Sequence, residues 1–301
     1  MRTADQEGTY YFIGDIMSEV KKFLCYEEQI EHLKSVGLTI EEDSVAKEIL
    51  SKVNYYRLIN AYSLGLYSSR NPEDRYIEGV TFYQLYDLYQ FDSELRQVLS
   101  VLLENFEILF RTKLAYYIGE KYGALGYLSP EIFKNDEYHT QFLEDLEREK
   151  THQSKSPIIE HHNEHYEGQL PIWVLVEIAS FGMISKMYSN LNDEDQKNLA
   201  KEFNVKAYYL KNWLRSFVEI RNVCAHYGRL YNKVLTFPPP LFRDMNFDNT
   251  RVFSVLYILT RFADDKLWLR QVLKLKVSFE EHKSVELHKV GFPEDWEKLW
   301  S

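Results

Sequence analysis

Cysteine is scarce in this chain of 301 residues. The only two, Cys25 and Cys224, lie far apart, and neither belongs to a CxxC pair. This pattern argues against a disulfide-stapled scaffold and against a cysteine-rich zinc site. Such low cysteine usage is typical of a reducing compartment, so we expect a cytoplasmic protein.

Long apolar runs are also missing. The longest, PIWVLVEIASFGMIS, is interrupted by Glu177 and is shorter than the roughly 20 apolar residues that a membrane-spanning helix needs. No basic segment followed by an apolar one opens the chain, so we expect no signal peptide. These features predict a protein without a membrane partner.

Positive charge is in deficit, and familiar cofactor motifs are absent. The net charge of −10 argues against a broad coating of nucleic acid, but a local basic groove remains compatible with it. The sequence contains no Walker loop, no GxGxxG, no HExxH and no GxSxG. Nucleotide hydrolysis, dinucleotide chemistry and zinc-protease chemistry therefore lack support, and we expect no cofactor.

Strand signals are scarce too, whereas helical periodicity is widespread, so we predict an all-α fold. From Thr81 to about Lys121, apolar residues recur every three or four positions, which predicts the longest helix. Residues 171–191 and 205–232 predict two more long helices. Thr39 and Glu42, in capping-box spacing, predict another helix start.

Composition divides the chain into four regions. We predict a tail of uncertain status at residues 1–16, an N-terminal helical region at 17–80, a helical core at 81–235 that contains a polar insertion at 122–170, and C-terminal helices at 236–301. The FPPP segment before the last region ends any helix there.

A polar cluster interrupts the aromatic helix predicted over residues 205–232. Its sequence, RNVCAHYGRLYN, begins at Arg221 and contains Asn222 and His226. Asn222 and His226 share one helix face, whereas Arg221 falls on an otherwise apolar strip. A guanidinium is costly to bury without a partner, so we expect another helix or subunit to bring an anionic group to Arg221.

Basic and aromatic residues surround this cluster. Residues 201–233 contain seven Lys or Arg against two Glu. Arg215 and Arg229 share the polar stripe with His226, and Tyr231 could stack on a base or complete the apolar seam. Cations interleaved with aromatic rings suit single-stranded nucleic acid. The alternative is an ordinary core beside a solvated face.

Two carboxylates are candidate partners for Arg221. Glu107 and Arg111 form an i, i+4 pair on the polar face of the helix predicted from Thr81. Either they are a surface pair that contributes little, or they face the motif. Glu177, inside an apolar helix, is the second candidate.

A histidine-rich stretch, HHNEHYEG, offers a competing site. His161 and His165 have the spacing of two metal ligands on a helix. The stretch is polar and loop-like, and no second ligand cluster accompanies it, so we favour a solvated surface and predict no metal.

The motif and its surroundings resemble a known family. RNVCAHYGRLYN is similar to the Arg-polar-x3-His signature of HEPN-type ribonucleases. YEEQIEHLKSVGLTI, VNYYRLINAYSLGLY, the 39-residue segment that begins LYDLYQFDSELRQVLS, and PIWVLVEIASFGMISKMYSNL resemble Abi-like abortive-infection proteins. These stretches run in order over residues 23–233.

The resemblance implies a HEPN-like helical bundle that forms a homodimer, with the two motif helices meeting at its axis. It implies a metal-independent endoribonuclease used in phage defence, with some members restrained by a small-RNA or protein antitoxin. By position, Arg221, Asn222 and His226 fall on the signature as catalytic residues, while Glu107 and Arg111 fall in an earlier helix where the family keeps polar residues.

That chemistry needs no metal, because RNA carries its own nucleophile in the 2′-OH. Histidine can move protons near neutral pH, and arginine can clamp a phosphate. Asn222 could orient the imidazole. Two alternatives remain: an RNA-binding or scaffold module of a defence or toxin–antitoxin system without catalysis, and a structural helical interaction protein.

Overall fold

The computed structural model describes residues 3–4, 10–11, 22–67 and 75–300. It confirms the all-α prediction, since the only strands in these ranges are β1 (Thr3–Ala4) and β2 (Tyr10–Tyr11), which pair antiparallel. Apart from these strands, the predicted tail at residues 1–16 lies outside the described residues. The chain forms two units, Met1–Arg57 with Gly65–Phe82, and Leu58–Leu64 with Tyr83–Ser301.

In the first unit, α1 (Tyr26–Ser35) packs against α2 (Asp43–Lys52). The short π-helix η1 (Tyr56–Asn60) begins in this unit, and its residues from Leu58 onward belong to the second. The predicted helix start at Thr39 is wrong, because α2 begins after Glu42. The Thr39 N–H instead donates to the Val80 carbonyl at 3.0 Å, in a parallel bridge between Thr39 and Thr81. Glu42 rather than Thr39 therefore takes the N-cap position of α2, and Thr39 belongs to the connection that precedes it.

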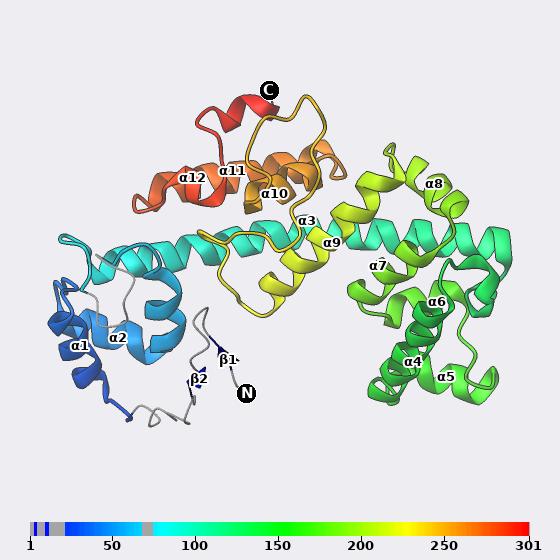
Figure 1. Ribbon diagram of the computed structural model, residues 1–301, viewed down its shortest axis with the longest axis horizontal. Coiled ribbons are helices and arrows are strands. Elements are labelled where there is room, and N and C mark those ends of the chain that lie inside the picture. Colours follow the sequence, from blue (N-terminus) through cyan, green and yellow to red (C-terminus); the bar gives the residue numbers. More distant parts are fainter. Residues whose placement is uncertain (1–2, 5–9, 12–21, 68–74, 301) are drawn as a thin grey trace. The chain divides into compact units, whose positions relative to one another are not determined.

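The second unit is built on α3 (Phe82–Tyr122), which confirms the long helix predicted from Thr81 (Figure 1). The remaining elements are η2 (Gly126–Leu128), η3 (Pro130–Ile132), α4 (Asp136–His152), α5 (Pro157–His165), α6 (Ile172–Ile178), α7 (Phe181–Asn190), α8 (Asp193–Lys201), α9 (Ala207–Ala225), α10 (Val252–Thr260), α11 (Asp265–Glu281), α12 (Leu287–Val290) and η4 (Trp296–Trp300). The C-terminal helices thus share this unit with the predicted core. Every helix in the described ranges is too short or too polar to cross a lipid bilayer.

The aromatic seam of α9 packs on α3. Trp213, Phe217 and Ile220 are fully buried, and the Phe217 ring lies 4.7 Å from the ring of Phe106 on α3. Each such side chain contributes about 1.5–3 kcal/mol through burial. In Figure 1, α9 crosses the middle of α3, and it also packs against α7, α8 and α10. The seam therefore fixes where the motif lies along α3.

The single helix predicted over residues 171–191 is two helices. Ala179 is extended, with ψ 142°, so α6 ends there. Ser180 then caps α7 by accepting the Met183 N–H at 3.3 Å. A serine that can cap a new helix competes with continuation of the old one. The break leaves the carbonyls of Val176 and Ala179 available to a side chain.

The helix predicted over residues 205–232 ends early, at Ala225. Tyr227 has φ 56°, and its N–H donates to the Cys224 carbonyl, while the Gly228 N–H donates to Val223 at 2.7 Å. This is a Schellman turn, with tyrosine in the left-handed position that glycine usually takes. The polar stripe predicted along this helix therefore stops at His226, and residues beyond it leave the helix axis.

Candidate functional site

The segment after His226 is held on α3 by a buried carboxylate. Asp92 is fully buried, and it accepts the Leu230 N–H at 2.8 Å, the Tyr231 N–H at 2.7 Å and the Tyr62 hydroxyl at 2.7 Å. Arg96, on the next turn of α3, donates to Asp92 at 3.0 Å. Burial raises the pKa of Asp92, while these four donors favour its ionised form.

Arg96 makes a second contact that holds the same segment on α3. Its guanidinium also donates to the Gly228 carbonyl at 3.1 Å, and only 7% of its side chain is exposed. A buried charge pair with every oxygen satisfied resists rearrangement. Asp92 and Arg96 thus fix the exit of the chain from α9, immediately after His226.

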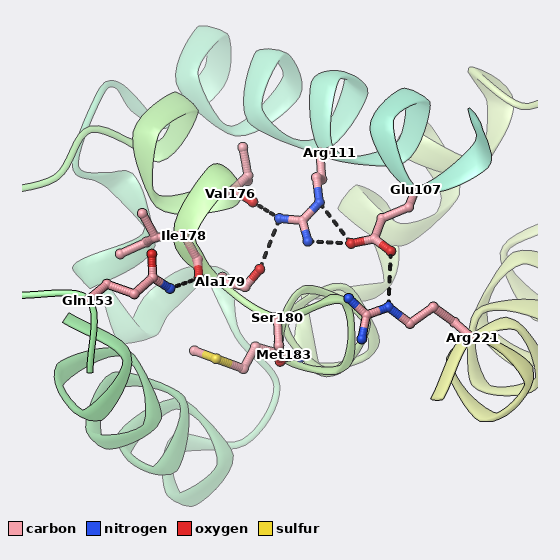
Figure 2. Close-up of polar contacts among 9 residues, drawn as sticks. All are labelled: Glu107, Arg111, Gln153, Val176, Ile178, Ala179, Ser180, Met183 and Arg221. Carbon is pink, nitrogen blue, oxygen red and sulfur yellow. Dashed lines mark hydrogen bonds and ion pairs between the residues drawn. The ribbon is translucent and has the colours of Figure 1, made fainter. Parts of the chain in front are cut away.

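Arg111 joins α3 to the break between α6 and α7. Its guanidinium donates to the Val176 carbonyl and, at 2.9 Å, to the Ala179 carbonyl. The opposite edge donates to Glu107, with Nε at 3.1 Å from Oε1. Figure 2 shows the guanidinium between the two freed carbonyls and the carboxylate. Arg111 is therefore fully engaged within the protein.

Glu107 also meets Arg221, which approaches from α9 (Figure 2). The Arg221 Nε lies 3.7 Å from Glu107 Oε2. Glu107 has 13% of its side chain exposed, whereas Arg221 has 42% exposed. Within the described ranges, no contact engages the two terminal nitrogens of Arg221, so they remain available to a phosphate oxygen.

These residues line a pocket of about 440 Å³ between α3, α6 and α9. Its wall consists of Ser100, Leu103, Glu104, Glu107, Ile108, Arg111, Glu177, Arg221, Cys224 and Ala225. Three carboxylates thus face two guanidinium groups, and one of those, Arg111, is already occupied. The excess of carboxylates therefore disfavours an anion inside the pocket itself.

The other two signature residues lie beside the pocket rather than in it. His226 is exposed at the C-cap of α9, one residue past Ala225 in the pocket wall, and Asn222 is exposed one turn earlier. Neither side chain makes a hydrogen bond or ion pair to any described residue. The structure therefore presents both to solvent, on the same helix end as Arg221.

The remaining candidates are placed differently. Arg215 stacks on the Phe237 ring at 4.3 Å. Arg229 donates to the Tyr231 carbonyl. Tyr231 is buried, which raises its pKa to about 12, and its hydroxyl accepts the Glu286 N–H at 3.3 Å. Arg229 and Tyr231 thus stabilise the segment that follows His226.

Glu177 and Cys224 also lie in the wall of the pocket. Glu177 is exposed and lines the pocket, but Glu107 is the carboxylate that Arg221 contacts. Burial raises the pKa of the Cys224 thiol to about 12, so this cysteine is a poor nucleophile despite its place in the wall.

The histidine-rich stretch, expected to be loop-like, lies in helix α5 as far as His165. His161 and His165 lie one turn apart, with ring centroids 4.7 Å from each other. The His162 Nδ1 bonds to the Ile158 carbonyl at 2.8 Å. In the described ranges no third ligand joins this pair, and the one group of three potential ligands lies elsewhere, at Glu94, Glu281 and His282.

Sequence reasoning missed Asp92 and Arg96. A signal was present, because Asp92 continues the buried stripe of Leu88, Leu95 and Leu99 along α3. A charge on an apolar stripe needs a partner, which is the criterion that drew attention to Arg221. The partners themselves could not be foreseen, since two are backbone amides of residues 230 and 231.

Comparison with known proteins agrees with the resemblance to Abi-like proteins. The model of the family described as Abi-like protein matches residues 48–232, which is more than half of the chain and includes the whole motif. No curated protein and no solved structure matches the chain. The chain belongs to the Abi-like protein family, and this membership indicates a role in abortive infection.

Proposed function

We propose that this protein is a metal-independent endoribonuclease of the HEPN type, acting as an abortive-infection toxin. It cleaves RNA by attack of the 2′-OH on the adjacent phosphate, in a site that two subunits complete. The observation that carries the proposal is the end of α9, where Asn222 and His226 are exposed beside a half-buried Arg221 that Glu107 contacts through Nε.

Arg221 is suited to bind the phosphate. Glu107 contacts only its Nε, so the terminal nitrogens can offer paired donors to two phosphate oxygens. As the 2′-oxygen attacks, negative charge grows on those oxygens, and a fixed guanidinium stabilises that charge more than it stabilises the ground state. Glu107 therefore positions the group that binds the transition state.

His226 is suited to move the protons. The imidazole accepts the proton of the 2′-OH, or donates one to the leaving 5′-oxygen. Both transfers are needed in one turnover, and one ring performs one of them at a time. Asn222, one turn away on the same face, can orient that ring or hold a phosphate oxygen.

A homodimer supplies the second histidine. In a two-fold dimer whose motif helices face each other, each site contains two His226 rings and two Arg221 side chains. The pocket of one chain has more carboxylates than cations. The second Arg221 gives a phosphate a second set of donors, while two-fold symmetry leaves the ratio of carboxylates to cations unchanged. A toxin of this kind is restrained by an antitoxin, either a small RNA or a protein.

The test is cleavage of RNA by purified full-length protein in EDTA, with mapping of the ends. We expect 2′,3′-cyclic phosphate ends, and a loss of at least 100-fold in His226→Ala. His165→Ala removes another exposed histidine and should cleave like wild type. Normal cleavage by His226→Ala would refute the proposal, and binding without cleavage by wild type would favour the RNA-binding module.

The dimer has its own test. Wild-type chains and His226→Ala chains are co-refolded in varied ratios, and cleavage is measured at constant total protein. A site that needs both histidines gives activity proportional to the square of the wild-type fraction. Activity that is linear in this fraction would mean that each chain works alone.

A further inference from the structure

A second cluster of ionisable side chains lies at the C-terminal end of α11, away from the motif. His282 caps α11 and is 8% exposed. Its Nδ1 lies 2.7 Å from Oδ1 of Asp87 on α3, and Asp87 also accepts the Ser284 N–H at 2.9 Å. The imidazole ring is therefore fixed in orientation by a buried carboxylate that is itself held in place.

The other ring nitrogen lacks a proper partner. His282 Nε2 is buried without a hydrogen bond of acceptable geometry, although Glu94 Oε1 lies 3.4 Å away. Glu281 approaches the same point, so that one ligand atom from each of Glu94, Glu281 and His282 lies within 4.8 Å of the others. A buried ring nitrogen and two carboxylates thus converge on one small volume.

We propose that His282 Nε2, Glu94 and Glu281 bind a divalent transition-metal ion of the zinc type. A histidine that ligates zinc usually donates its other N–H to a carboxylate, which fixes the tautomer and the ring, and Asp87 stands in that position. Two carboxylates neutralise the charge of the ion, and one imidazole favours zinc over magnesium or calcium.

The competing arrangement is a metal-free ion triad. In that case a protonated His282 lies between Asp87 and Glu94, and Glu281 has no part in it. The two arrangements differ in what they require of Glu281. This side chain is exposed, and no contact within the described part of the chain engages it, so only a metal site depends on it.

The site would join the C-terminal helices to α3. Glu94 belongs to α3, whereas Glu281 and His282 end α11. An ion bound only by the folded chain stabilises that chain by mass action, so zinc should raise the melting temperature as its concentration exceeds the dissociation constant. The site takes no part in the proposed RNA chemistry, and the two proposals can fail separately.

The experiment measures Zn²⁺ binding to full-length protein stripped with a chelator, by competition with a chromophoric chelator. We expect one ion per chain, and at least tenfold weaker binding in Glu281→Gln. Glu280→Gln makes the same charge change one residue earlier on α11 and should bind like wild type. The double variant His161→Gln/His165→Gln should also retain the ion. That result would show that the ion does not bind to the histidines of α5.

Two results would overturn the proposal. One is the absence of any stoichiometric ion at Zn²⁺ concentrations below about a millimolar. The other is equal affinity in Glu281→Gln and Glu280→Gln. A melting temperature that rises with Zn²⁺ in wild type and in Glu280→Gln, but not in Glu281→Gln, would support it by an independent measurement.

Discussion

Replacement of Asp92 by asparagine tests how the motif is anchored. The carboxylate is fully buried and receives four donors, three of them on Oδ2 and the Tyr231 N–H on Oδ1. Asparagine keeps one acceptor oxygen but turns an NH₂ group toward one of the donors. It also leaves the Arg96 guanidinium, 7% exposed, without a counter-charge. Loss of one partner of a buried pair costs about 3–5 kcal/mol, and the retained acceptor places Asp92→Asn near the lower value.

Thermal and urea unfolding measure this cost. At roughly 2–4 °C per kcal/mol for a unit of this size, the melting temperature should fall by roughly 6–12 °C. Asp195→Asn is the matched control, because Asp195 is also fully buried, and it accepts Lys121 and the hydroxyls of Tyr117 and Tyr122. Both variants should lose stability.

Local hydrogen exchange separates the two variants. Only Asp92→Asn should increase exchange at the amide of Leu230 or of Tyr231 beyond the change in global stability, because these amides use different oxygens of Asp92 and asparagine replaces one of the two with an NH₂ group. It should also reduce RNA cleavage more than Asp195→Asn does at equal stability. A loss below about 1 kcal/mol, with unchanged exchange at these amides, would refute the anchoring role.

Three further predictions follow from the contacts around the motif. Glu107→Gln should cost about 1–3 kcal/mol and weaken cleavage, because Arg221 and Arg111 lose their shared counter-charge; unfolding and cleavage assays measure the two effects. Arg111→Lys should cost a similar amount in urea unfolding, since an ammonium cannot reach the carboxylate and two carbonyls together. Glu219, on α9, accepts the N–H groups of Thr236 and Phe237 and pairs with Lys233. Burial raises the pKa of Glu219, but these donors outweigh burial and hold the pKa below the ordinary 4.5. The stability difference between wild type and Glu219→Gln should therefore be full above pH 4.5 and shrink as the pH falls through the lowered pKa.

Each of these has a result that would count against it. For Glu107→Gln, the comparison is Glu104→Gln, which removes an exposed pocket carboxylate that has no described partner and should leave stability unchanged. Equal effects would mean that the Arg221 contact is incidental. Arg111→Lys should destabilise more than Arg215→Lys, whose cation only stacks on a ring. A pH-independent difference for Glu219→Gln would mean that the carboxylate is not ionised by its neighbours.

The candidate site shows where sequence reasoning works and where it stops. The i, i+4 spacing of Glu107 and Arg111, and the charge of Arg221 on an apolar strip, follow from helix geometry alone. The helix ends did not follow. Ser180 and Tyr227 redirect the chain through local hydrogen bonds that compete closely with helix continuation, so composition and periodicity do not decide them. The freed carbonyls that bind Arg111 exist only because of the first break.

By itself, the sequence determined the all-α class, the long helix from Thr81, the buried seam of α9 and the motif with its family, because periodicity and order along the chain are local properties. Only the tertiary structure decided that Glu107 meets Arg221, that Asp92 holds residues 230 and 231, and that His282 converges with Glu94. These pairs are separated by between 114 and 188 positions along the chain. No local pattern encodes such a separation, because the packing of whole helices sets which side chains come within reach of one another.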